Sequence, residues 1–230
     1  MEKIRGARAR ARDEVTAAIK DEARRQLAAE GAAKLSLRAV ARELGMVSSA
    51  LYRYFPSRDE LLTALIVDAY NALGAAAEAA LAAPAAEGGD HLARWTGVCR
   101  AVRAWAVAHP HEYALLYGSP VPGYHAPRDT VGPASRVGLA LVGVVRAAHD
   151  DGSARPCPEP PGELRDEARR IAAELAPGLP PGSALVLLRT WSQLFGLISF
   201  EVFGQFDRIV TEREAFFAEA AARLGREAGL

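Results

Sequence analysis

Apolar residues recur at helical spacing along most of this chain of 230 residues. In residues 7–30, one face of the expected helix carries Val15, Ile19, Ala23 and Leu27. Alanine is abundant and runs of β-branched residues are scarce, so helices are favoured over strands. Half of the residues are apolar, and a chain of this length can bury a sizeable core. The pattern therefore predicts an all-α globular protein.

Proline, glycine and capping residues divide the chain into helices. Ser36 is placed to cap a short helix, and Ser57 with Glu60 has the form of a capping box. Thr211 and Glu214 form a second such pair. Helices are predicted over 7–30, 37–44, 48–54, 58–83, 90–108, 111–117, 133–150, 163–175, 183–203 and 211–224. Loops rich in proline or glycine are predicted over 84–89, 118–129 and 151–162.

The net charge is zero overall but is unevenly distributed. Residues 1–60 carry 13 Lys or Arg against 9 Asp or Glu, and the remainder carries 15 against 19. This small basic excess at the N-terminal end is consistent with an anionic partner. The stretch 183–203 is apolar but contains Arg189, Gln193 and Glu201, so we interpret it as a buried helix rather than a membrane span. Two cysteines and a charged N-terminus without an apolar run predict a cytoplasmic protein.

Two short helices, at 37–44 and 48–54, are joined by a turn that contains Gly45. This is the helix-turn-helix arrangement, in which the second helix enters the major groove of DNA. Leu51 and Phe55 are expected to face inward, which leaves hydroxyls and a guanidinium outward on Ser48, Ser49, Tyr52, Arg53 and Tyr54. Such groups can donate to phosphate oxygens. On spacing alone, two solvated helices of a bundle fit equally well.

The run "LSLRAVARELGMVSSALYRYFPSRDELL", residues 35–62, closely resembles the DNA-binding segment of TetR-family transcriptional repressors. The resemblance implies a homodimer in which each subunit has a three-helix N-terminal reader and a larger helical bundle that binds a small effector. The corresponding domains are residues 1–57 and 58–230. The implied function is a ligand-responsive repressor that binds a near-palindromic operator and is released by a small, largely apolar effector.

The resemblance also implies roles for single residues. Ser36, Arg38 and Arg58 would meet the phosphate backbone, Tyr52 and Tyr54 would brace phosphates, and Ser48, Ser49 and Ala50 would lie nearest the base edges. Val47 stands where the family commonly has a capping serine or threonine. Since valine cannot cap, we expect the helix start to shift by a residue or to rely on Ser48. The predicted DNA-binding residues are Ser36, Arg38, Val47, Ser48, Ser49, Ala50, Tyr52, Arg53, Tyr54 and Arg58.

The leader "KIRGARARARD", residues 3–13, is rich in arginine. We expect residues 1–8 to form a flexible arm. It would either reach phosphates or the adjacent minor groove, or remain a disordered, solubilising tail. The sequence leaves both alternatives open.

The segment "RAWAVAHPHEYALLYGSP", residues 103–120, resembles the regulatory domain of one TetR subgroup whose hallmark is a Trp, His and Gly set, here Trp105, His109 and Gly118. Trp105 and His109 are four residues apart, so we expect them to share a helix face and line one cavity. The alternative is that Trp105 packs in the core and His109 caps the turn before Pro110. The predicted effector-binding residues are Trp95, Cys99, Trp105, His109, Tyr113, Tyr117, Trp191 and Phe195.

The last two helices are predicted to form the dimer surface, because apolar residues cover nearly the whole circumference of 184–203. The alternative is a purely internal hairpin. The predicted interface residues are Leu188, Phe195, Ile198, Val202, Phe216, Phe217 and Ala220.

Catalysis and metal binding have little support in the sequence. His109 and His111 have no third ligand at a usual spacing, so no metal site and no cofactor are predicted. No nucleophile elbow or phosphate-binding glycine loop is present, so the chain is not predicted to be an enzyme. The alternative function is a small-molecule-binding or catalytic helical protein without a role on DNA.

Overall fold

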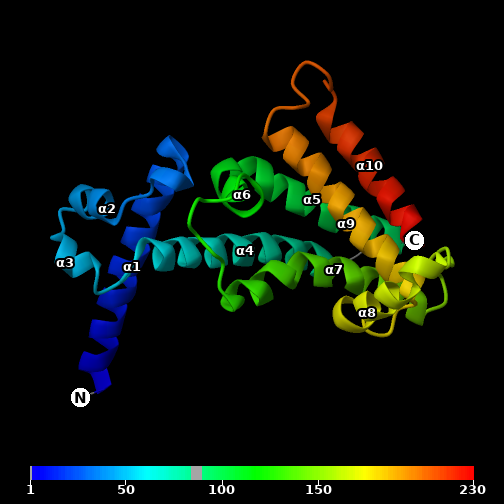
Figure 1. Cartoon of the computed structure of the whole chain (residues 1–230), viewed down its shortest axis with the longest axis horizontal. Coiled ribbons are helices and arrows are strands. Elements are labelled where there is room, and N and C mark those ends of the chain that lie inside the picture. The colour runs from blue at the N-terminus through cyan, green and yellow to red at the C-terminus, as the bar shows by residue number, and fades with distance from the viewer. Residues whose placement is uncertain (1, 84–89) are drawn as a thin grey trace. The chain divides into compact units, whose positions relative to one another are not determined.

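A computed structural model describes residues 2–83 and 90–230 (Figure 1). Within these ranges every regular element is a helix, which confirms the predicted all-α fold. Met1 and the predicted loop at 84–89 lie outside the described residues. The elements are α1 (Glu2–Glu30), η1 (Ala32–Lys34), α2 (Leu37–Glu43), α3 (Ser48–Leu51), α4 (Arg58–Ala82), α5 (His91–Ala108), α6 (Pro110–Tyr117), η2 (Arg128–Thr130), α7 (Val131–Asp150), η3 (Gly162–Leu164), α8 (Arg165–Leu175), α9 (Pro181–Val202) and α10 (Arg213–Glu227).

The chain forms two compact units. The first contains the residues up to Tyr70 together with His109–Val131, and the second contains Asn71–Ala108 and Gly132–Leu230. These bounds differ from a division at residues 57 and 58, because α6 and the loop that follows it pack with the helix-turn-helix. Leu115, Val121 and Tyr124 lie against its core.

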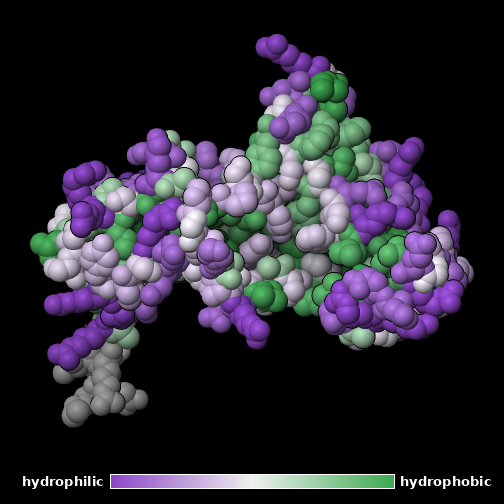
Figure 2. Space-filling model, in the orientation of Figure 1, coloured by the Kyte–Doolittle hydropathy of each residue, from purple (hydrophilic) through white to green (hydrophobic). Residues whose placement is uncertain are grey.

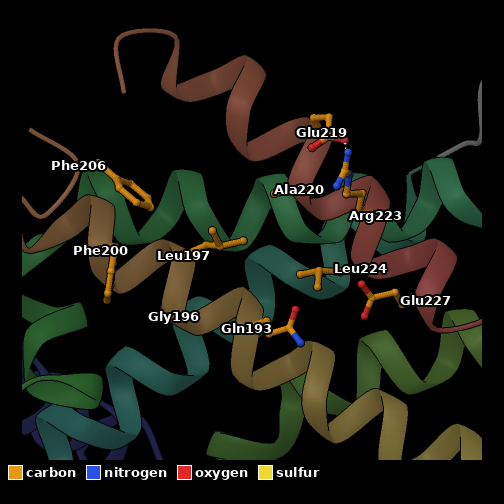
Figure 3. Close-up of a pocket in the computed structure, with 10 residues that line it drawn as sticks. All are labelled: Gln193, Gly196, Leu197, Phe200, Phe206, Glu219, Ala220, Arg223, Leu224 and Glu227. Atoms are coloured by element: carbon orange, nitrogen blue, oxygen red, sulfur yellow. Dashed lines mark hydrogen bonds and ion pairs between the residues drawn. The ribbon is translucent and has the colours of Figure 1, made fainter. Parts of the chain in front are cut away.

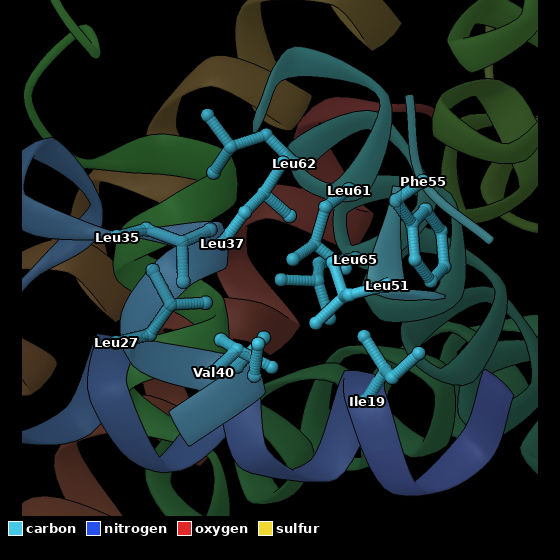
Figure 4. Packing of buried hydrophobic residues seen from close by; sticks show 12 residues of the cluster. Ile19, Leu27, Leu35, Leu37, Val40, Leu51, Phe55, Leu61, Leu62 and Leu65 are labelled. Atoms are coloured by element: carbon cyan, nitrogen blue, oxygen red, sulfur yellow. The ribbon is translucent and has the colours of Figure 1, made fainter. Parts of the chain in front are cut away.

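The core of the first unit is built from the apolar faces of α1, α2, α3 and the first turns of α4 (Figure 4). Ile19, Val40, Leu51 and Leu61 are fully buried at its centre. These residues come from four different helices, and burial of each side chain contributes about 1.5–3 kcal/mol. The cluster therefore holds α3 in a fixed position on α1 and α4.

The turn between α2 and α3 depends on Gly45. Its φ is +65°, in the left-handed region that a side chain with a Cβ rarely adopts. The Gly45 N–H donates to the carbonyl oxygen of Arg42 at 3.1 Å, and the Met46 N–H donates to that of Ala41 at 2.8 Å. These bonds close the end of α2 and turn the chain into α3.

In the second unit, α5 packs against both α9 and α10, and α8 packs against α9. The indole N–H of Trp95 in α5 donates to the carbonyl oxygen of Ala221 in α10 at 3.0 Å. At the other end of α5, Arg103 forms a bidentate pair with Glu201 at 2.6 and 2.7 Å and also contacts Glu214. These side chains fasten α5 to the α9–α10 hairpin.

Apart from the start of α1, the predicted helix ends lie within three residues of the observed ones, and three differences are informative. Residues 2–8, expected as a flexible arm, are helical from Glu2. The second helix of the helix-turn-helix ends at Leu51 and continues only as turns. The predicted capping box at Thr211 is wrong, because α10 begins at Arg213 and Glu214 pairs instead with Arg103 and Arg100.

Three helical stretches among the described residues are long and apolar enough to cross a membrane by length and composition alone: Arg58–Ala82, Arg128–Asp150 and Pro181–Val202. In each, one face packs against other helices, and 33–44% of the most apolar window is buried inside the protein. The second stretch also carries Arg136, whose guanidinium pairs with Glu78 at 2.6 Å and donates to the backbone carbonyl of Asn71 at 2.9 Å. The apolar residues of these three stretches therefore serve in part to pack the protein core.

Candidate nucleic-acid interface and effector region

The start of α2 is organised by Ser36 and Arg58. The Ser36 side chain accepts from the backbone N–H of Ala39 at 3.4 Å, so its predicted capping role is confirmed. Arg58, at the start of α4, donates to the carbonyl oxygens of Ala32 at 2.9 Å and Leu35 at 3.2 Å. Its guanidinium is therefore engaged with the segment that precedes α2, which gives Arg58 a positioning role.

Helix α3, the second helix of the helix-turn-helix, begins directly after Val47. The expected shift does not occur: Val47 is the N-cap residue, it makes no side-chain cap, and its carbonyl accepts from the Ala50 N–H at 2.9 Å. Its side chain is 70% exposed, which is unusual for valine. Ser48 and Ser49 are also exposed, whereas Leu51 beneath them is fully buried. The exposed strip at the start of α3 therefore consists of the two methyl groups of Val47 and the hydroxyl groups of Ser48 and Ser49.

A groove of about 450 Å³ runs between the start of α2 and the start of α4. It brings together Ser36, Arg38, Tyr52 and Arg58 from the predicted DNA-binding residues, with Ser57 beside them. Ser57 caps α4 by accepting from the Glu60 N–H at 3.1 Å, so its part in the predicted capping box is confirmed. Two helix N-termini, the exposed Arg38 guanidinium and hydroxyls in one groove make an environment suited to a phosphate.

Tyr54 is half-buried against the core of the first unit. The Arg12 guanidinium lies over its ring, with 5.0 Å from Cζ to the ring centroid, and Arg12 Nη2 donates to the Arg53 carbonyl oxygen at 3.4 Å. Arg53 itself is exposed. Sequence reasoning missed Arg12. The available signal was its spacing, since Arg12 lies seven residues before Ile19 and hence on the same face of α1.

The predicted effector-binding residues are divided between the two units. His109, Tyr113 and Tyr117 belong to the first, while Trp95, Cys99, Trp105, Trp191 and Phe195 belong to the second. The expectation that Trp105 and His109 share one helix face is wrong. Helix α5 ends at Ala108, because the residue before Pro110 disfavours the helical conformation, and His109 becomes the N-cap of α6.

In the second unit the predicted effector residues are largely core. Trp95 and Cys99 are fully buried, and Trp105 is 8% exposed. Burial raises the pKa of the Cys99 thiol to about 12, so the group is neutral. Trp191 and Phe195 stack on α9 with ring centroids 5.2 Å apart, and Phe195 is also buried. Trp95 has a clear structural role, since a Cβ on Gly225 of α10 would lie 2.9 Å from its indole.

In the first unit the tyrosines form a cluster that sequence reasoning described only in part. Tyr113 is fully buried, and its ring lies 5.0 Å from that of Tyr117, centroid to centroid. Tyr70 of α4, which was not predicted, meets Tyr117 edge-on at 6.1 Å. Burial, then the neighbouring hydroxyls of Tyr70 and Tyr113, raise the pKa of Tyr117 far above its ordinary value. Tyr124 is hydrogen-bonded to Thr63 at 2.9 Å.

The predicted dimer residues lie on two sides of the α9–α10 hairpin. Phe195, Ile198 and Phe217 are buried within the chain and offer no free surface. Leu188 and Phe216 are 39% and 43% exposed, and Val202 and Ala220 are half-buried. Phe200, which is 53% exposed, and Phe203 were not predicted, and together with the exposed Gly196 they complete this side.

A groove of about 460 Å³ lies on this exposed side, between α9 and α10 (Figure 3). Gly196, Leu197, Phe200 and Leu224 contribute apolar surface, and charged residues such as Glu219 and Arg223 stand at its edge. The two charges pair at 2.6 Å. No group of three metal-ligating side chains occurs among the residues that the structure describes.

Comparison with known proteins identifies the family. A sequence model described as "Bacterial regulatory proteins, tetR family" matches residues 19–65, and one described as "Tetracyclin repressor-like, C-terminal domain" matches residues 95–224. The HTH-type transcriptional regulator Rv1816 of Mycobacterium tuberculosis is 43% identical over 225 residues, which cover 95% of this chain and 94% of that protein. The chain belongs to the TetR family.

Solved structures agree with this assignment to the TetR family. The crystal structure of the protein SCO4313 covers 94% of this chain and 97% of its own, with 38% identity and a TM-score of 0.76. PfmR from Thermus thermophilus, a TetR Family Transcriptional Regulator, covers 92% of this chain and 96% of its own. At 19% identity and a TM-score of 0.58, PfmR supports the fold alone.

This TetR-family chain is a helix-turn-helix transcriptional regulator whose DNA-binding part is N-terminal, within the first unit. The predicted resemblance is thereby confirmed. The family is one of regulators and is generally non-enzymatic.

Proposed function

We propose that this TetR-family regulator is a ligand-responsive repressor that binds a near-palindromic operator as a homodimer. The observation that carries the proposal is the exposed strip of α3 beside the groove at the starts of α2 and α4. The strip supplies groups for reading base edges, and the groove supplies groups for holding a phosphate. In a two-fold dimer the two recognition helices would meet successive major grooves about 34–36 Å apart.

The predicted DNA-binding side chains of the helix-turn-helix have different proposed roles, according to their chemistry. Ser48 and Ser49 would donate to base edges, whereas Val47 and Ala50 would contact thymine methyl groups. Arg38 and Tyr52 would hold phosphates in the groove, together with the capped N-terminus of α2. We assign Arg58 and Tyr54 to positioning, since Arg58 donates to backbone carbonyls and Tyr54 lies beneath Arg12.

The homodimer is proposed to form through the exposed side of α9 and α10. Leu188, Ser192, Gly196 and Phe200 follow one another at intervals of four residues, so they make one ridge along α9. A Cβ on Gly196 would meet nothing within 4 Å in the chain itself. The exposed glycine inside an apolar ridge is therefore suited to the close approach of a second helix, and Phe216 of α10 extends the apolar surface.

The effector is proposed to be a small, largely apolar molecule. The aromatic side chains within residues 95–195 support this chemistry, although Trp95 and Trp105 are buried in the core of the second unit. For release from DNA, the effector must bind more tightly to the conformer that does not fit the operator than to the one that does. Equal affinity for both conformers would not shift the equilibrium between them. A regulator that binds chromosomal DNA would act in the cytoplasm.

Footprinting with DNA from the region upstream of its own gene tests the proposal. We expect a protected, near-palindromic site at low protein concentration and a loss of protection as salt is raised. Arg38→Ala and Tyr52→Phe should weaken protection, whereas a change of Arg169, an exposed residue of α8 that pairs with Asp166, to Ala should not. Absence of any salt-sensitive protection would reject operator binding. Reporter expression that falls on deletion of the regulator would exclude a repressor.

A further inference from the structure

The N-terminal part of α1 continues beyond the core of the first unit. In Figure 1, α1 extends past α2 and α3 toward the N-terminus. The last fully buried residue of α1 in this direction is Ile19. The residues from Gly6 to Glu14 are all exposed, and in Figure 2 purple, hydrophilic side chains project from this end of the molecule, with some pale green atoms beside the grey ones. Packing alone therefore does not explain why the helix extends so far.

The arginines of this extension have two different orientations. An α-helix turns by about 100° per residue, so residues seven and eleven positions before Ile19 point within about 20° of it. These residues are Arg12 and Arg8. Arg10 lies nine positions before Ile19 and points to the opposite side. Arg12 and Arg8 therefore lie on the same face of α1 as Ile19, beyond the part of that face that packs in the core.

The contacts of Arg12 show that this face of α1 lies beside the end of α3. Its guanidinium donates to the Arg53 carbonyl oxygen at 3.4 Å and covers the Tyr54 ring, so it is fixed at the C-terminal end of the recognition helix. Arg8 lies one helical turn further along the same face, about 6 Å along the axis. Among the described residues Arg8 has no ion-pair partner, and Asp13 and Glu14 point well away from its side of the helix.

We propose that the N-terminal extension of α1 is a second DNA-contacting element, in which Arg8 binds a phosphate of duplex DNA beside the half-site read by α3. The contact is independent of base sequence, because a guanidinium on a phosphate carries no sequence information. Arg12 is a positioning residue, since its contacts with residues 53 and 54 hold the extension in register with α3. This inference rests on DNA binding by the helix-turn-helix and adds a contact outside the motif.

Helical order in the extension favours binding over a disordered tail. A flexible arm loses backbone conformational entropy when it binds DNA, whereas the backbone of a preformed helix has already been ordered by folding. The helix also separates Arg8 from Arg10 onto opposite sides, which a disordered tail would not do. The two residues therefore offer a matched pair for an experiment.

The test compares Arg8→Gln with Arg10→Gln in the full-length protein. Both remove one positive charge from the same exposed segment and keep a residue with good helix propensity. Affinity is measured by fluorescence anisotropy at several salt concentrations on two probes. One is a duplex from the region upstream of the regulator's own gene, and the other is a duplex of the same length and random sequence.

We expect Arg8→Gln to weaken binding about tenfold at low salt and Arg10→Gln to change it less than about twofold. In a dimer the first variant removes two phosphate contacts, so the slope of log affinity against log salt should fall in magnitude by about 1.8. Equal effects of the two variants would mean a merely solvated basic tail and would overturn the proposal. Equal binding of the wild-type protein to both probes would instead reject operator recognition, while the comparison of Arg8 with Arg10 on the random duplex would still decide the phosphate contact.

Discussion

Arg58, the first residue of α4, donates from Nη2 to the carbonyl oxygen of Ala32, the first residue of η1, at 2.9 Å. A second bond reaches the Leu35 carbonyl oxygen at 3.2 Å. The start of the long helix α4 is therefore tied to the segment that sets the start of α2. Because both helix starts line the proposed phosphate groove, the geometry of that groove depends on an arginine whose Nε and Nη2 donate to backbone carbonyl oxygens of the protein.

Arg58→Ala should lower both stability and DNA affinity. It leaves carbonyl oxygens of residues 32–35 without their charged donor, and we expect a loss of about 1–3 kcal/mol in the free energy of unfolding. Arg38→Ala, which removes an exposed side chain of the same groove, should weaken DNA binding without a comparable loss of stability. Urea unfolding and a gel-shift titration on both variants check this. An Arg58→Ala protein of unchanged stability would contradict the positioning role.

Phe200→Ser should weaken the homodimer. Phe200 is the last residue of the proposed interface ridge and is 53% exposed, and truncating an aromatic anchor of an interface commonly raises a dissociation constant by tenfold or more, about 1.4 kcal/mol. Leu139→Ser on α7 is the control, because Leu139 is 56% exposed but lies outside the ridge. Sedimentation velocity over a dilution series measures the effect. Similar dissociation of both variants would argue against the α9–α10 face.

Gly225→Ala should destabilise the second unit although alanine is the better helix former. The added Cβ would lie 2.6 Å from the Leu92 side chain and 2.9 Å from Trp95, and overpacking of this kind costs about 1–3 kcal/mol. Gly138→Ala in α7 meets nothing within 4 Å and should stabilise by up to about 1 kcal/mol. Thermal unfolding of the two variants should therefore shift in opposite directions.

The two cysteines should differ sharply in reactivity. Cys99 is fully buried, and burial raises its pKa to about 12, so little thiolate forms near neutral pH. Cys157 is only partly buried. In the native protein a thiol reagent such as a disulfide dye should label Cys157 and leave Cys99 intact, whereas both should react after unfolding. Rapid native labelling of a Cys157→Ser variant would show that Cys99 is accessible.

Asp151 should contribute to the loss of stability in acid. The Ser153 hydroxyl, then His91 at 2.6 Å, lower the pKa of Asp151 from an ordinary 3.8 to about 2. Because the folded-state pKa is the lower one, the stabilisation is present above about pH 4 and is lost as the pH falls through 2. Asp151→Asn should therefore be less stable at neutral pH and show a flatter decline between pH 4 and pH 2. Urea midpoints over this range compare the two proteins, and parallel curves would refute the assignment.

Local patterns were sufficient for much of the fold. Helical spacing predicted the elements to within a few residues, and the short-range caps at Ser36 and Ser57 form as expected. The run of residues 35–62 pointed to the TetR family, because its signature lies within one contiguous motif. Errors arose where a distant residue competes for a side chain. Glu214 pairs with Arg103 from α5 instead of joining Thr211 in a cap.

The sequence by itself determined that the chain is helical, approximately where most of its helices begin and end, and which family it resembles, since all of these depend on residues close together in the chain. Only the tertiary structure decided which side of α9 is buried, because apolar residues surround that helix and periodicity cannot choose among them. The tertiary structure also decided the contacts of two further side chains. The Trp95 indole N–H donates to a carbonyl oxygen of α10, and Arg12 donates to the Arg53 carbonyl oxygen just after α3. The physical reason is that each of these contacts joins side chains to helices many residues away.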